Sequence, residues 1–282
     1  MRSDDDTDGG ATERGWFALN RASWNARTPV HVASRFYDVA AFAGGASSLR
    51  EIELAQVGDV AGRTLLNVPC HFGQDTLSWA RLGATVTGLD LSDASVAAAR
   101  DLAASVGVAA RFVQGNVFDA PEALGGETFD VVFSSYGALG WLPRLGPWAR
   151  AVAACLRPGG VFHLVEFHPA VWVWDDAFER MVYAYDAPGE PIVNEQTGTY
   201  ADRASTVAVR EVGFNHGLAS VVSALLAEGL RVEALREYDW SPYDIFPDTE
   251  EVAPGRFRLR RFGRSVPLVY GLVARRPEAP RP

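Results

Sequence analysis

The residues best placed to do chemistry lie in LLNVPCHFGQDTLSWARLGATVTGLDLSDA, residues 65–94. This stretch has the pattern of a strand, a tight loop, a helix and a second strand. In an open parallel sheet, ligands bind beyond the strand ends, and the free N–H groups of the following helix favour a carboxylate or phosphate there. Asp90 ends the second strand 23 residues after Asn67 (90 − 67), where its carboxylate can accept hydrogen bonds from both hydroxyls of a ribose.

Two cofactors compete for this geometry. A dinucleotide needs a G-x-G-x-x-G turn, so that the backbone can approach the pyrophosphate, but those positions hold Pro69, His71 and Gln74. S-adenosylmethionine has no pyrophosphate and presents a carboxylate and an ammonium group on its methionine arm. Its usual loop, acid-x-Gly-x-Gly-x-Gly, falls on Asn67, Pro69, His71 and Gly73, so one glycine of three is present. The loop by itself argues against a dinucleotide more strongly than it argues for S-adenosylmethionine.

Later segments decide between them. FDVVFSSYGALGWL (129–142), a helix, and LRPGGVFHLVEF (156–167) closely resemble the latter half of a class I S-adenosylmethionine-dependent methyltransferase, in which an Arg-Pro-Gly-Gly turn precedes the fifth strand. CHFGQDTLSWARLGA (70–84) resembles a variant first motif in which Cys-His-Phe-Gly replaces the glycine-rich loop. From about Ala22 to Arg276 the chain is similar to a bacterial small-molecule methyltransferase of this class.

The resemblance implies a fold, a cofactor and a set of contacts. The fold is a doubly wound, Rossmann-like α/β sheet of seven strands with an antiparallel last strand, and the cofactor is S-adenosylmethionine, with S-adenosylhomocysteine as product. By position, the methionine moiety would be surrounded by Asn67, Pro69, Cys70, Phe72, Gly73 and Asp75. The ribose and one adenine face would be held by Asp90, Leu91 and Ser92, and the adenine would be met by Asn116 and Val117. The sulfonium would lie above Ser135 and Tyr136. Asn67 stands where the family commonly has an acid, and Asn116 where it commonly has an aspartate.

Several side chains are candidates for contact with the methyl acceptor. A general base is needed only if the acceptor must lose a proton. His168, in EFHP, and His216, in FNHG, are candidates for that role, with a structural role as the alternative, and Tyr136 is a third catalytic candidate. His71 either donates to the cofactor carboxylate or only shapes its loop. Glu166 is a weaker candidate than the two histidines.

Alternating strand and helix patterns position these residues on a parallel sheet. We expect one methyltransferase domain over 15–282, with a helical cap at 15–62, an aromatic lid insertion at about 170–214 and a disordered acidic tail at 1–14. The predicted strands are 63–68, 84–90, 109–116, 129–137, 161–169, 231–240 and 266–277, the predicted helices are 74–83, 93–107, 145–160 and 217–230, and a half-exposed strand or hairpin is predicted at 255–264.

Composition restricts the partners. The net charge is −9 and the pI about 5.1, which argues against a nucleic-acid partner. All 26 basic residues are arginine, which excludes chemistry that needs a lysine. Two cysteines in unrelated segments predict neither a disulfide nor a metal site, and no apolar run is long enough to cross a membrane. We expect a cytoplasmic protein, and the five histidines form no metal-binding pattern.

The sequence therefore predicts a methyltransferase that moves a methyl group from S-adenosylmethionine to an oxygen or nitrogen of a small organic molecule. The first alternative is a same-fold enzyme that uses the sulfonium for cyclisation or aminocarboxypropyl transfer. A nucleic-acid or protein methyltransferase ranks lower, because SSYGAL replaces the Asn-Pro-Pro-aromatic signature at the fourth strand. A non-catalytic cofactor-binding module is a further alternative, and a nicotinamide oxidoreductase is the last. The acceptor and the oligomeric state stay open.

Overall fold

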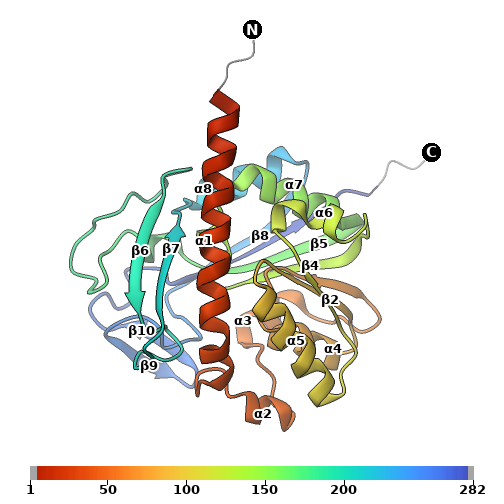
Figure 1. Cartoon of the computed structure of the whole chain (residues 1–282), viewed down its shortest axis with the longest axis horizontal. Helices are drawn as coiled ribbons and strands as arrows, with labels where there is room; N and C mark the ends of the chain where they lie inside the picture. The colour runs from red at the N-terminus through yellow and green to blue at the C-terminus, as the bar shows by residue number, and fades with distance from the viewer. Residues whose placement is uncertain (1–4, 279–282) are drawn as a thin grey trace.

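The centre of the molecule is a seven-stranded β-sheet with the order β3-β2-β1-β4-β5-β11-β8, seen in a computed structural model that describes residues 5–278 (Figure 1). β11 runs antiparallel to both neighbours, β5 and β8, whereas the pairs among the first five strands are parallel. The predicted sheet with an antiparallel last strand is confirmed. The strands are β1 Thr64–Asn67, β2 Thr85–Asp90, β3 Arg111–Gln114, β4 Phe129–Ser135, β5 Leu156–Phe167, β8 Arg231–Tyr238 and β11 Val269–Arg275.

Helices cover both faces of the sheet because the buried strands are apolar on both sides. Neighbouring residues of β1 point to opposite faces. Leu66 packs in a core with α7 and α8, and Leu65 packs in a second core with Trp79 of α4. Burying each of these large side chains stabilises the fold by about 1.5–3 kcal/mol. The helices in these layers are α3 Glu51–Val57, α4 Gln74–Arg81, α5 Asp93–Val106, α6 Ala120–Ala123, α7 Leu145–Cys155 and α8 Leu218–Ala227.

A long helix, α1 (Asp5–Ala33), crosses the front of the sheet in Figure 1, and the short α2 (Val39–Ala43) follows it. α1 contacts β7 and α5, and the Asn20 side chain anchors it by bonding both the N–H and the C=O of Val212. The cap predicted at 15–62 contains most of α1 together with α2 and α3. Of the tail predicted at 1–14, residues 1–4 lie outside the described part and residues 5–14 are the first turns of α1.

Two segments between sheet strands lie over the strand ends. The predicted insertion, 170–214, contains the antiparallel pair β6 (Ile192–Thr197) and β7 (Ala208–Gly213). The second segment, 239–268, contains the pair β9 (Thr249–Ala253) and β10 (Arg256–Leu259), which agrees with the strand or hairpin predicted at 255–264. The sequence did not predict that this second segment shares in covering the site. Within residues 5–278, no helix is both long and apolar enough to pass through a membrane.

Candidate active site

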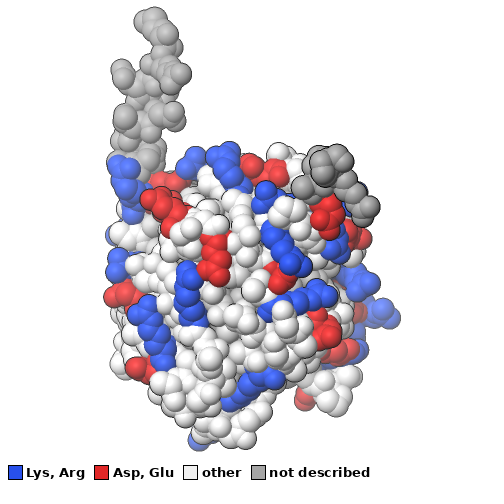
Figure 2. Space-filling model, turned by 90° about the vertical axis from the view of Figure 1, so that its right-hand side faces the viewer, with Lys and Arg blue, Asp and Glu red and all other residues white. Residues whose placement is uncertain are grey.

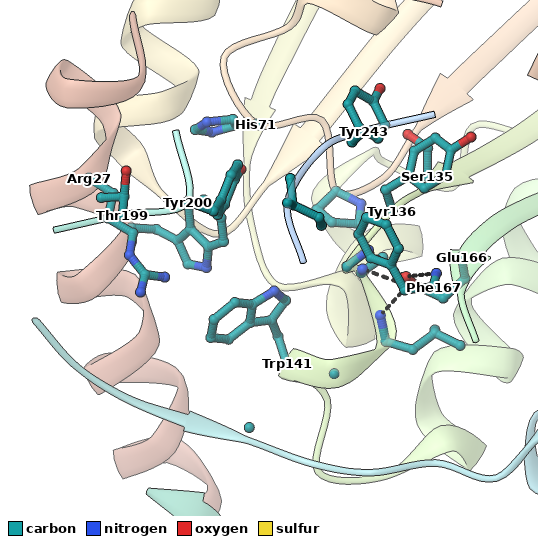
Figure 3. A pocket seen from close by; sticks show the side chains of 18 of the residues that line it. Arg27, His71, Ser135, Tyr136, Trp141, Glu166, Phe167, Thr199, Tyr200 and Tyr243 are labelled. Carbon is teal, nitrogen blue, oxygen red and sulfur yellow. Dashed lines mark hydrogen bonds between the residues drawn. The ribbon is translucent and has the colours of Figure 1, made fainter. Parts of the chain in front are cut away.

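A cavity of about 1150 Å³ lies at the carboxyl ends of β1, β2, β4 and β5. Its walls also include side chains from α1, from 170–214 and from 239–268, so the strand ends form the floor and the added segments form a cover. Figure 3 shows side chains from these separate parts facing the same space. Cavities for one small ligand usually measure about 300–1,000 Å³, so this volume has room for a cofactor and a second molecule.

One corner of the cavity combines an unpaired amide oxygen with a buried carboxylate. Asn67 donates its Nδ2 hydrogen to Thr76 Oγ1 at 2.9 Å, and within the described protein its buried Oδ1 accepts no hydrogen bond. Asp75 accepts from Ser48 Oγ at 2.6 Å and from Ser135 Oγ at 3.1 Å. Burial raises the pKa of Asp75, because no cation fully compensates its charge. The two acceptors fit an ammonium group, and Asp75 supplies the acid that position 67 lacks.

Asp90, at the end of β2, accepts one backbone hydrogen bond on each of its two carboxylate oxygens. Its two oxygens accept the backbone N–H groups of His71 at 2.7 Å and Ser92 at 2.9 Å. Burial raises the pKa of Asp90 to about 6 even though these two bonds oppose the shift. Each carboxylate oxygen keeps a second lone pair, so a pair of ribose hydroxyls can still be accepted.

The loop after β1 contains one glycine, and a second residue, His71, also has a left-handed backbone conformation. Gly73 has φ +86°, and a Cβ there would lie 2.7 Å from the Phe112 ring, so glycine is required. His71 has φ +49°, a conformation that is uncommon outside glycine. Cys70 is buried against Gly88, where a Cβ would lie 2.8 Å from the sulfur, so it is a packed residue that lines the cavity.

His71 is engaged on both ring nitrogens. Nε2 lies 3.0 Å from Nδ1 of His31 in α1, and Nδ1 lies 3.2 Å from Ser95 Oγ in α5. Burial, followed by the charges of His31 and Arg27, lowers the pKa of His71 well below its usual range, so the ring is neutral. Of the two roles left open by the sequence, the contacts favour a neutral ring that shapes the loop and holds α1 against it.

Leu91, Asn116 and Val117 line the end of the cavity nearest β3, as expected for an adenine site, beside the short helix η1 (Val117–Asp119). Asn116 caps η1, because its Oδ1 accepts the N–H of Phe118 at 3.0 Å. Ser92 requires a correction. It is buried outside the cavity, where its Oγ donates to Asn25 Oδ1 at 2.6 Å, so its backbone N–H positions Asp90 while its side chain ties α1 to α5.

At the end of β4, Ser135 and Tyr136 line the cavity. Tyr136 has φ +35°, a rare conformation for a large side chain. Its hydroxyl donates to Glu53 Oε2 in α3 at 3.0 Å. Burial and then the charge of Asp75 raise the pKa of Glu53 to about 7. Sequence reasoning missed Glu53, because three residues after Arg50 it reads as a helix-capping acid, and it does accept the Arg50 N–H at 3.3 Å.

The two histidines proposed as bases have different positions. His168 lies outside the cavity: Nε2 pairs with Glu237 Oε1 at 2.7 Å, and Nδ1 accepts the N–H of Ala170 at 3.1 Å. The prediction that it reaches the acceptor is therefore corrected to a role in fixing the chain after β5. His216 lines the cavity, donates from Nε2 to the Leu142 carbonyl at 2.6 Å, and keeps an unpaired Nδ1 within the described protein.

Glu166, the weaker candidate for contact with the acceptor, accepts hydrogen bonds from backbone N–H groups. Its carboxylate accepts the N–H groups of Gly137, Ala138 (2.7 Å), Leu139 (3.0 Å) and Phe167 (2.7 Å). Dashed lines at Glu166 in Figure 3 mark hydrogen bonds of this carboxylate. These bonds oppose the rise in the pKa of Glu166 that its burial causes. A carboxylate with this many donors orders the turn after β4 and the helix η2 (Leu139–Trp141), rather than taking a proton from an acceptor.

The cover of the cavity is tied together by a buried ion pair. Arg27 in α1 binds Glu211 in β7 at 2.6 Å, and both side chains are less than a tenth exposed. The Arg27 guanidinium also lies 5.3 Å from the Trp24 ring and 5.9 Å from the Trp141 ring. Nearby, the hydroxyls of Tyr37 and Tyr200 lie 2.5 Å apart and join the end of α1 to the loop after β6. These contacts hold α1 and the segment 170–214 of the cover together.

Comparison with known proteins agrees with this geometry. Residues 65–160 match the family model described as a methyltransferase domain. The chain is 29% identical over 184 residues to an uncharacterized methyltransferase of Synechocystis sp., an alignment that covers 64% of this chain and 84% of that protein. It is 34% identical over 122 residues to the ubiquinone biosynthesis O-methyltransferase of Sodalis glossinidius, over 43% of this chain and about half (48%) of that enzyme.

The fold is also similar to that of a solved methyltransferase structure. The crystal structure of an S-adenosylmethionine-dependent methyltransferase from Mesorhizobium loti superimposes with a TM-score of 0.54 at 23% identity, over 83% of this chain and 100% of that one. Within the matched domain, Asn67 and Asp90 end β1 and β2 and Asp75 lies in the first turn of α4, and their free acceptors fit the ammonium and ribose groups of the cofactor. Residues 65–160 thus form a methyltransferase domain, and these findings support a class I S-adenosylmethionine-dependent methyltransferase.

Proposed function

We propose that this methyltransferase acts on an oxygen or nitrogen atom of a small organic molecule in the cytoplasm. The observation that carries the proposal is the cover over the strand ends, in which α1 and the two added segments line a partly open cavity of about 1150 Å³. A recessed cavity of this size suits a small acceptor beside the cofactor, whereas a nucleic acid or protein substrate needs a wider surface. The similarity to an O-methyltransferase supports the same class of acceptor.

The surface charge supports a small acceptor as well. Figure 2 shows arginine and acidic side chains interspersed over one face, with no continuous basic stripe on it. Together with the net charge of −9, this favours a molecule that binds without the phosphate contacts of a nucleic acid.

We assign the cofactor contacts by their chemistry. Asp75 and the free oxygen of Asn67 would hold the ammonium group, Asp90 the ribose hydroxyls, and Leu91 and Val117 the faces of the adenine. When bound, S-adenosylmethionine supplies an electrophilic methyl group on a sulfonium. The chain contributes by positioning the acceptor in line with that group and by excluding water, and positioning alone accounts for much of the acceleration in such displacements.

The first test is binding and product analysis with the purified protein. Calorimetric titration is expected to give micromolar binding of S-adenosylmethionine and S-adenosylhomocysteine and no binding of NADH. Asp90→Asn should weaken both by about 100-fold, because two hydrogen bonds to a charged acceptor, together worth about 3 kcal/mol, are reduced.

Turnover is then measured with a panel of small alcohols, phenols, amines and anilines. Formation of S-adenosylhomocysteine with a methylated product is the expected result. Methylthioadenosine as product would instead identify the alternative chemistry, cyclisation or aminocarboxypropyl transfer. Binding of the cofactor without turnover of any small acceptor, combined with methylation of a protein or nucleic acid, would overturn the proposal.

A further inference from the structure

One wall of the cavity is built from aromatic rings that contact one another. Tyr136, at the end of β4, lies 5.0 Å from the Tyr243 ring and 5.3 Å from the Phe167 ring. Phe167 lies 5.5 Å from Phe246 and 6.0 Å from Trp172. All five residues line the cavity, and we call this set the aromatic chamber. It adjoins Ser135, the residue assigned to the neighbourhood of the sulfonium.

Aromatic residues also stand across from this wall. Phe36 lies 5.6 Å from the chamber residue Tyr243 and 5.5 Å from Tyr200, and the Tyr200 hydroxyl contacts that of Tyr37. Figure 3 shows Tyr200 facing into the space from the side opposite Tyr136 and Phe167. Rings prefer offset-stacked or edge-to-face contacts with other rings, so a cavity lined in this way suits a flat aromatic molecule.

The positive side chains along the cavity are already engaged. Arg27 is paired with Glu211, the Arg50 guanidinium lies 5.2 Å from the Tyr243 ring, and Arg203 donates to the Ile245 carbonyl at 3.2 Å. Of these three, only Arg27 is paired with a carboxylate. None of the five chamber residues is itself charged, so the chamber suits the ring of an acceptor.

One polar pair interrupts the apolar wall. The Tyr136 hydroxyl donates to the Glu53 carboxylate at 3.0 Å, and Glu53 is completely buried behind it. The hydroxyl oxygen has lone pairs left to accept a hydrogen bond. A group that binds at this oxygen would thus be connected to a carboxylate that is able to take a proton.

We propose that the acceptor is a phenol held in the aromatic chamber, and that Tyr136 with Glu53 behind it receives the phenol proton. The inference rests on the proposed function and deepens it. The acceptor oxygen forms the new bond to the methyl carbon, the sulfur keeps the electron pair of the broken S–C bond, the phenol proton passes to the Tyr136 oxygen, and the Tyr136 proton passes to Glu53. Tyr136 is the catalytic residue in this scheme, and Glu53 is a positioning residue that acts through it.

The test uses phenols of graded acidity. With an unsubstituted or alkyl phenol, Tyr136→Phe and Glu53→Gln should each lower kcat by about 10²- to 10⁴-fold, the usual range for losing general-base assistance. With a nitrophenol that is already ionised at the assay pH, the same variants should stay within a few-fold of wild type, because no proton has to be removed. For the weakly acidic phenol, kcat of the wild type should rise with pH, and Glu53→Gln should abolish that rise.

The controls separate this role from a structural one. Tyr238→Phe and Glu233→Gln make the same chemical changes outside the cavity and should leave the dependence on phenol acidity unchanged. The ionised phenol also reports, within each variant, whether the folded site is intact, and binding of S-adenosylhomocysteine by calorimetry checks this independently.

Three results would overturn the inference. Equal losses with weakly acidic and ionised phenols would mean that Tyr136 and Glu53 only maintain the fold. A selective loss in His216→Asn in place of the two variants would assign the proton to His216. Turnover of amines or aliphatic alcohols but of no phenol would reject the acceptor class while leaving the proposed function in place. Failure of the whole acceptor panel would instead count against the proposed function itself.

Discussion

At the scale of single residues, three carboxyl groups lie near the β1, β2 and β4 ends. Asp90 and Glu53 are buried and Asp75 is partly buried, and loss of solvent is the largest cause that raises the pKa of each. A carboxyl group whose pKa rises on folding favours the folded state least when it is ionised. The ionised groups therefore lower the stability of the folded protein at neutral pH, where they are available to a cationic ligand.

Glu53 allows this cost to be measured. Its pKa rises from 4.5 to about 7, so its ionisation destabilises the fold progressively from about pH 4.5 to pH 7. At pH 5, Glu53→Gln should be more stable than the wild type by less than about 1 kcal/mol. At pH 8 the variant should be more stable, by about 3 kcal/mol according to the size of that shift. Urea unfolding at both pH values measures the difference, and a variant that is equally or less stable at pH 8 would contradict the assigned ionisation.

At the scale of elements, the decisive feature is how α1 is attached. The helix is held to α5 and its N-terminal loop by polar contacts of Asn25 and Thr28, and to β7 by Arg27. These contacts differ in burial, and burial determines what each is worth. An exposed ion pair contributes about 0–1 kcal/mol, whereas removal of one partner from a buried pair costs about 3–5 kcal/mol.

Two arginines in α1 provide a matched comparison. Arg27→Met should destabilise the protein by about 3–5 kcal/mol, because Glu211 loses its buried cation. Arg21→Met removes an exposed pair of similar length with Asp93 and should cost less than about 1 kcal/mol. In Arg27→Met/Glu211→Gln, most of the loss should be recovered. Urea denaturation distinguishes these cases, and equal effects of the two single substitutions would show that the Arg27 pair does not fasten the cover.

At the scale of the whole molecule, the cavity is built from three parts of the chain: the strand ends at one edge of the sheet, α1, and the two added segments that lie over that edge. The strand ends supply the acidic groups, α1 supplies Arg27 and Trp24, and the two added segments supply Tyr200, Tyr243 and other rings. A ligand that binds in this space contacts all three parts at once. Binding should therefore stabilise the folded state as a whole.

S-adenosylhomocysteine at a free concentration of 100 times its Kd should add about 2.7 kcal/mol to the free energy of unfolding. For a chain of this size, the corresponding increase in Tm is roughly 5–10 °C. A thermal melt followed by circular dichroism measures it, with NADH as the control ligand. An equal increase with NADH, or none with S-adenosylhomocysteine, would contradict the assigned cofactor site.

The sequence by itself determined the sheet, the family and the cofactor. Its strand and helix signals are local, since a hydrophobic period and a capping residue lie within a few positions of each other. Asn67, Asp90, Asn116 and Ser135 could be placed at the site for a related reason. Each follows a parallel strand, and the carboxyl ends of parallel strands meet at one edge of a sheet.

The tertiary structure alone decided where the remaining side chains point. His168 also follows a strand, yet its ring turns to Glu237, 69 positions away, and Ser92 turns to Asn25, 67 positions away. Glu53 meets Tyr136 across 83 positions, and Arg27 meets Glu211 between a helix and a hairpin with no shared sequence pattern. The orientation of a side chain depends on the partners that pack against it, and such distant partners become neighbours only when the chain has folded.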